Sequence, residues 1–168
     1  RSVSAFLLNR SSDLLVTEFI DLPFWTDVVT SQPTGYVEDA NGNVEIYSAE
    51  GLAWLAVVTN GFHNQEANSF VGKTVKLNSD INIEGYRWYP IGNNLKFEDI
   101  PWNAGYYVGG FSGTFEGQNH KISNIYMNDD AGSLFGAVFM GRIKNVILDG
   151  GHVICNGGGG LISYALDC

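Results

Sequence analysis

Basic residues are scarce in this chain of 168 residues. Lys and Arg number nine against eighteen Asp and Glu, which gives a formal net charge of −9. Such a charge repels nucleic-acid phosphates and anionic membrane surfaces, so we expect neither as a partner. Long apolar runs are also missing: the longest, residues 52–58, is far shorter than the roughly 20 residues that a membrane-spanning helix needs. The sequence therefore predicts no membrane span.

Cysteine is almost as rare, with only Cys155 and Cys168 in the chain. An even number is compatible with one disulfide and equally with two separate thiols, so both readings stay open. The chain begins at Arg1, with no initiator Met and no charged-then-apolar leader. We therefore expect either that a signal peptide has been removed or that the chain is a fragment of a longer protein.

Turn-forming residues, in contrast, are abundant. The chain has 21 Gly and 16 Asn, while hydrophobic residues make up 45% and charged residues only 16% of the sequence. Enough apolar residues are present to form a core. The excess of Gly and Asn favours many short strands joined by tight turns. The expected class is all-β.

Two parts of the chain differ in pattern. Residues 1–34 show neither clear alternation nor a helical stripe, and we interpret them as strand and loop. Residues 35–168 begin with a hairpin signal, Asn41-Gly42 between two short alternating segments. This second part is expected to form a capping hairpin and helix followed by the main β structure.

One helix is predicted, over residues 49–59. Ser48 is a suitable N-cap and Gly61 stands just past the expected last helical residue. Its apolar residues lie on nearly every side of the helix, which is typical of a helix that is buried all round. We expect it to close one end of the fold.

The second half of the chain repeats itself. Residues 122–127 match residues 143–148 at an offset of 21 positions, and residues 133–136 match residues 160–163 at an offset of 27. Two related motifs in the same order indicate coils of roughly 20 to 30 residues stacked along an axis. The pattern predicts a β-solenoid.

Particular residues recur in these motifs. Asn124 and Asn145 align in the first pair, and we expect their side chains to hydrogen-bond the neighbouring coil. The second motif supplies apolar positions and one glycine to the coils. These positions are Leu134, Phe135, Gly136 and Leu161.

Several segments together resemble the GLUG-motif family of secreted and surface bacterial proteins. They are residues 46–55, 70–83, 88–92, 111–125, 132–136 and 143–146. The resemblance implies a right-handed parallel β-helix with a capping helix at its N-terminal end, here of two to three coils. Proteins of this family include adhesins, and related segments stand beside the protease domain of immunoglobulin-cleaving metallopeptidases. Ser133 and Ser163 depart from the glycines usual in the Gly-Leu-Phe-Gly motif.

Candidate metal sites fail on spacing. The segment beginning at His63 resembles an inverted zinc-protease motif, but Ala67 stands where the second His is needed. Asp39 and Asn41 fit the start of a calcium loop, but Val44 occupies the place that demands Gly. We therefore predict neither a metal nor another cofactor.

The candidate binding residues lie in an insertion at residues 93–110. Trp102, Tyr106 and Tyr107 offer flat apolar faces with polar edges, which suit sugar rings or a protein partner. The alternative is that these rings fold back and cover the flank of the coils. If the chain has a ligand site, we expect it here.

The sequence favours a non-catalytic extracellular or cell-surface module for adhesion or ligand display. Its expected partner is a host or cell-surface glycan or protein. The strand-like stretch at residues 161–166 has no polar cap after it, which also predicts self-association through an open solenoid edge. Two alternatives remain: a structural subunit of a surface fibre, and a carbohydrate-active enzyme, which needs two carboxylates with one raised pKa.

Overall fold

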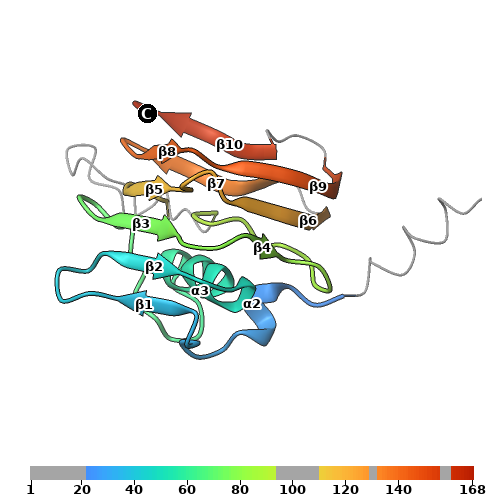
Figure 1. Ribbon diagram of the computed structural model, residues 1–168, viewed down its shortest axis with the longest axis horizontal. Coiled ribbons are helices and arrows are strands. Elements are labelled where there is room, and N and C mark those ends of the chain that lie inside the picture. Colours follow the sequence, from blue (N-terminus) through green and yellow to red (C-terminus); the bar gives the residue numbers. More distant parts are fainter. Residues whose placement is uncertain (1–21, 94–109, 129–131, 156–159) are drawn as a thin grey trace, which may run out of the picture.

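The computed structural model describes residues 22–93, 110–128, 132–155 and 160–168. Within these ranges most secondary structure is β, with two helices (Figure 1). No helix in the described part is long and apolar enough to span a membrane.

Short strands form three sheets, and with one exception neighbouring strands run parallel. The five-stranded sheet consists of β1 (Tyr36–Glu38), β2 (Val44–Ile46), β3 (Thr74–Leu77), β5 (Thr114–Glu116) and β8 (Arg142–Lys144). The three-stranded sheet consists of β4 (Ile81–Asn82), β6 (Lys121–Asn128) and β9 (Ile147–Ile154). The two-stranded sheet pairs β7 (Ser133–Phe139) with β10 (Gly160–Leu166).

The chain visits these sheets in turn and so forms a β-solenoid of about four turns. This confirms the predicted fold, but the prediction of two to three coils was too low. The missed coil begins at β2, which forms the predicted antiparallel hairpin with β1 and also pairs in parallel with β3. Val44 pairs with Val75, and Thr74 pairs with Thr114. In the sequence, the helix and residues 93–110 stand between strands of these first coils and hide their period.

The strand register tests the two sequence offsets. Ser133 pairs with Gly160 and Phe135 with Ile162, which confirms the offset of 27. The offset of 21 was wrong as a coil length, because Ile122 pairs with Leu148 and lies in a different sheet from Ile143. The offset of 21 instead aligns strands from two different faces of the solenoid. Their sequences match because apolar and polar positions alternate similarly on both faces.

Helix α3 (Ala49–Asn60) closes the N-terminal end of the solenoid, as predicted, and ends one residue later than expected. The Ser48 hydroxyl accepts a hydrogen bond from the N–H of Gly51 at 3.2 Å. Gly61 ends the helix with φ 70°, a left-handed conformation that favours glycine. Nine of its twelve residues are buried.

A second, short helix lies in the segment interpreted as strand and loop. Helix α2 (Trp25–Val28) has only four residues, too few for a periodic pattern to show in the sequence. Phe24, just before it, forms a parallel bridge with Arg87. The indole N–H of Trp25 donates to the carbonyl oxygen of Ile83 at 2.8 Å. This hydrogen bond attaches the segment to the turn that follows β4.

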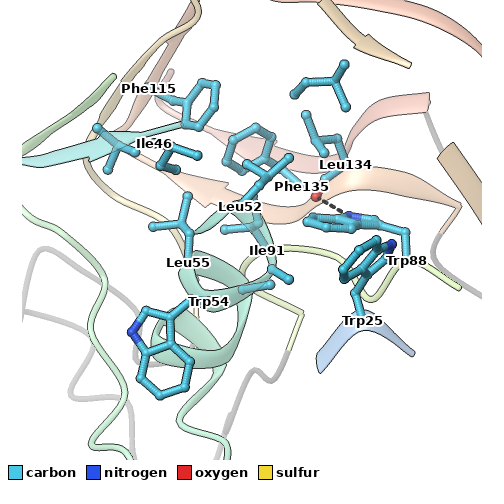
Figure 2. Close-up of a cluster of buried hydrophobic side chains, with 14 of the residues drawn as sticks. Trp25, Ile46, Leu52, Trp54, Leu55, Trp88, Ile91, Phe115, Leu134 and Phe135 are labelled. Carbon is cyan, nitrogen blue, oxygen red and sulfur yellow. Dashed lines mark hydrogen bonds between the residues drawn. The ribbon is translucent and has the colours of Figure 1, made fainter. Parts of the chain in front are cut away.

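The core fills the space between the sheets and α3 (Figure 2). Phe135 is completely buried, with its ring centroid 5.4 Å from that of Phe111 and 5.3 Å from that of Phe115. The indole N–H of Trp88 donates to the carbonyl oxygen of Leu134 at 3.1 Å, so this buried polar group is satisfied (Figure 2). Apolar layers therefore continue from coil to coil.

The remaining motif positions have structural roles. Leu134 is fully buried and Leu161, one coil later, is partly buried. A Cβ at Gly136 would lie 2.7 Å from Cβ of Asn93, which explains why glycine stands there. Cys155 and Cys168 are separate thiols in the structure.

Candidate functional site

The best-formed candidate site is a hollow on the outer face of the three-stranded sheet, which we call the outer hollow. Its volume is about 260 Å³. This lies just below the usual range of about 300–1,000 Å³ for drug-sized ligands, so it suits a small group such as one sugar ring. The lining includes Glu84, Asn124, Tyr126, Gly151 and His152.

Bent strands form this hollow. Asn124 in β6 has φ 57°, and Gly150 and Gly151 in β9 have φ 75° and 138°. These left-handed residues turn both strands at the same level, because Ile125 pairs with Gly151. A Cβ at Gly151 would lie 2.5 Å from the carbonyl oxygen of Ile125, so only glycine allows the two strands to approach this closely.

Asn82 connects two sides of the outer hollow. Its side-chain oxygen accepts a hydrogen bond from the N–H of Glu84 and another from the amide of Asn124, both at 3.1 Å. The first contact holds the turn that carries the Glu84 carboxylate, and the second holds the neighbouring coil. This confirms that Asn124 bonds an adjacent coil, as expected from the sequence.

Two rings stack at the other side. The Tyr126 and His152 rings have centroids 6.0 Å apart and an interplanar angle of 23°. Tyr126 is buried whereas His152 is exposed. The His152 imidazole therefore packs on the buried Tyr126 ring and is exposed to solvent. The carboxylate of Glu84 and the amide of Asn124 belong to the same hollow. Such a group of acceptors, donors and a flat ring suits a hydroxyl-rich ligand.

A second hollow, of about 520 Å³, lies beside α2. The ring of Tyr89 packs edge-to-face against those of Phe24 and Phe62, with centroids 5.5 and 5.1 Å apart. The guanidinium of Arg87 lies 4.1 Å from the ring centroid of Phe24. These groups contact one another and thereby attach α2 to the solenoid, so we assign them a packing role.

The predicted site residues are only partly brought together. Asn124 lines the outer hollow, but Asn145 lies in another turn and donates to the carboxylate of Glu116 at 2.8 Å. The predicted alignment of the two asparagines was wrong, because they belong to different turns of the coil. Trp102, Tyr106 and Tyr107 lie outside the described residues.

Sequence reasoning missed three members of the site, Glu84, Tyr126 and His152. The signal that could have found two of them is the true coil register, which pairs Tyr126 with His152, 26 residues later. Glu84 belongs to a turn, where its backbone N–H donates to the Asn82 side chain, and no strand pattern in the sequence marks this position.

No protein-family model matches this sequence, and no curated protein and no solved structure shows significant similarity to it. The outer hollow must therefore be interpreted from its own chemistry. Within the described ranges, no group of three or more His, Cys, Asp or Glu side chains is arranged to hold a metal ion.

Carboxylates at the turns between the five-stranded and three-stranded sheets bond adjacent coils. The N–H of Lys121 and the imidazole of His120, each 3.0 Å from Oδ1, lower the pKa of Asp80 below its ordinary value. The side-chain amide of Asn145 is the largest cause of the lowered pKa of Glu116. Both carboxylates are therefore stabilised in the charged form.

This arrangement predicts a loss of stability in acid that depends on Asp80. Because its pKa is lower in the folded chain than the unfolded value of about 3.9, its stabilising effect is present above that pH. The effect is lost as the pH falls through the folded pKa. Carboxyl groups titrate between about pH 3 and about pH 5. Across this range, the Tm of Asp80→Asn is expected to fall less with decreasing pH than the Tm of the wild type.

Circular dichroism melts at several pH values measure this effect. Glu66→Gln, which changes an exposed carboxylate elsewhere, serves as the matched control and is expected to keep the wild-type acid dependence. An Asp80→Asn chain whose Tm falls as steeply as that of the wild type would contradict the assignment.

Proposed function

We propose that this chain is a non-catalytic binding module of a bacterial cell surface that holds a sugar ring in the outer hollow. The observation that supports the proposal is the convergence of the Glu84 carboxylate, the Asn124 amide and the His152 imidazole on one hollow. Each comes from a different coil. Adhesion or ligand display by such a module follows from its binding a cell-surface glycan.

The solenoid ladder supports this function by fixing the groups before a ligand arrives. Seven residue pairs connect β6 with β9 in one register. The Asn82 side chain fixes the turn of Glu84 against Asn124. Groups held in this way lose little conformational entropy on binding, which improves affinity for a small ligand.

Charge favours neutral or amino sugars over anionic ones. The chain has a formal net charge of −9, and Glu84 places a carboxylate at the hollow itself. An anionic sugar would meet repulsion both from the overall field and from this group. The proposed ligand class is therefore a neutral hexose or hexosamine at the end of a glycan.

The lining of the outer hollow favours binding over cleavage. Glycoside hydrolysis needs a pair of carboxyl groups that flank the scissile bond. The described lining of the hollow contains one carboxylate, that of Glu84. The resemblance of residues 111–125 to the GLUG-motif adhesins also supports a binding role and an extracellular location.

A glycan array with the intact chain at physiological salt tests the proposal. We expect binding to neutral or amino-sugar termini and at least about tenfold weaker binding by His152→Ala, the equivalent of about 1.4 kcal/mol. His63→Ala, which removes another exposed imidazole far from the hollow in sequence, is the matched control. His152→Ala is expected to keep the wild-type Tm, since its side chain is exposed. His63→Ala also removes a 2.6 Å hydrogen bond to the carbonyl oxygen of Thr26, so it is expected to lower Tm while leaving glycan binding unchanged.

A second variant separates the outer hollow from the aromatic insertion. Trp102→Ala/Tyr106→Ala/Tyr107→Ala is expected to keep binding if the outer hollow is the site. Loss of binding in this variant alone would move the site to the insertion. Absence of binding by the intact chain would overturn the sugar-binding proposal, and cleavage of a bound glycan would overturn its non-catalytic part.

A further inference from the structure

All three sheets end on the same coil. In their strand order, β8, β9 and β10 each stand at one end of a sheet. Figure 1 shows them stacked together at the end of the solenoid opposite α2 and β1. An edge strand carries a row of N–H and C=O groups on the side without a neighbouring strand, so this end offers three edges in one layer.

The same coil carries most of the exposed large apolar side chains of the described residues. They are Met140, Ile147, Val153, Ile154, Tyr164 and Leu166. Further apolar side chains of this coil, including Ile143, Leu148 and Leu161, are only partly buried because the core covers them from one side. The counterparts of Ile143 and Leu148 in the previous coil, Phe115 and Ile122, are fully buried.

The charged side chains of the five-stranded sheet favour one kind of partner at this open end. Along the outer face of the five-stranded sheet, the register places Glu45 beside Lys76, Lys76 beside Glu116 and Glu116 beside Lys144. We call these four residues the charge column. Each member has an opposite charge on the neighbouring strand, and Nζ of Lys144 lies 4.0 Å from a carboxylate oxygen of Glu116. Lys144 is the last member and is half exposed.

We infer that the open end of the last coil binds a further parallel β-coil that carries an acidic side chain opposite Lys144. Such a coil would continue the alternation of the charge column, since opposite charges directly across two strands are favourable and like charges are unfavourable. Its inward apolar side chains would cover Ile143, Leu148 and Leu161. The inference does not depend on the proposed sugar site.

A second copy of this chain does not supply such a coil. Two copies joined symmetrically through β8 would bring Arg142 and Lys144 of one copy against the same cations of the other. Two copies stacked end to end would place β1 on β8. β1 runs antiparallel to β2 and carries Val37, without a charge, at the position of the charge column. The partner is therefore a different polypeptide segment.

The turn after β10 shows how an added coil can be tested. Met140 leads β7 into β8 with φ 54°, and Asp167, 27 residues later, has the same φ of 54° after β10. Gly141 and Cys168 occupy the next position in each case. A segment joined directly after Cys168 is therefore in register to lie on β8.

The experiment extends the full chain by a copy of its own residues 114–139, joined after Cys168. In this copy the equivalent of Glu116 falls opposite Lys144. We expect Tm to rise by about 5 °C or more, since solenoid stability grows with each coil interface. We also expect amide hydrogen exchange in β8, β9 and β10 to slow at least about tenfold. Glu116→Lys within the appended copy alone is the matched control, with a Tm about 2–4 °C lower than that of the acidic version.

Three results would overturn the inference. The first is an appended copy that leaves hydrogen exchange in β8, β9 and β10 unchanged. The second is equal stabilisation by the acidic and basic copies, which would remove the preference for an acidic side chain. The third is sedimentation of the unmodified chain as a concentration-dependent dimer that the extended chain does not form, because a second copy would then be the occupant.

Discussion

Replacing Phe135 with alanine is expected to lower the free energy of unfolding by about 3–5 kcal/mol. Its ring is fully buried and packs against both Phe111 and Phe115. β7, which carries it, pairs with β10 and forms a bridge with Ile91 on the opposite side. Because ladder hydrogen bonds hold the backbone in place, neighbouring side chains cannot move in to fill the cavity. Urea unfolding followed by tryptophan fluorescence measures the loss.

Tyr164→Ala is the matched aromatic control for this prediction. Tyr164 lies on β10, beside β7, and is 54% exposed. Its ring packs edge-to-face against that of Phe139, so its removal is expected to cost less than about 1 kcal/mol. Equal losses in the two variants would show that Phe135 does not lie at the centre of the core.

Gly51→Ala is expected to destabilise the chain by about 2–3 kcal/mol, although alanine is the better helix former by about 1 kcal/mol. Gly51 lies in the first turn of α3, and a Cβ there would lie well inside contact distance of the carbonyl oxygen of Gly35. That oxygen also accepts the N–H of Tyr47 at 2.9 Å. The helix would have to move away from the hairpin and lose this close packing.

Glu50→Ala tests whether the effect is specific to Gly51. Glu50 is the adjacent residue in the same turn and is exposed, so its replacement is expected to cost less than about 1 kcal/mol, mainly through its interaction with the helix dipole. Thermal and urea unfolding of both variants provide the comparison. A Gly51→Ala chain more stable than the wild type would mean that α3 does not lie this close to the hairpin.

Local signals predicted much of the fold because the same residues carry them in the structure. Ser48 and Gly61 bound the helix, and Gly42 takes the left-handed conformation (φ 79°) expected in the hairpin turn. The offset of 27 between residues 133 and 160 is a true coil length. The cap and the positive φ are requirements met by residues close together in the chain, and the offset of 27 is visible because the same apolar motif recurs in consecutive coils.

The rest depended on contacts between distant residues. β2 belongs to the solenoid because of its pairing with β3, about 30 residues away, and its sequence shows only the hairpin. The stacking of Tyr126 on His152 likewise follows from the register of two strands. Alternating patterns recur on every face of a solenoid, so sequence similarity alone does not distinguish the next coil from the next face.

Stacked coils also determine how the molecule would respond to mechanical load. The hydrogen bonds between coils run along the solenoid axis, so tension between the two ends pulls directly on them, and coils would detach from the ends, where the outermost strands are paired on one side only. Thr114 pairs with Arg142, 28 residues later, and a detached coil of that length extends by about 90–100 Å at 3.3–3.6 Å per residue. The chain would therefore lengthen in discrete steps under force, and each step would dissipate energy while the remaining coils stay folded.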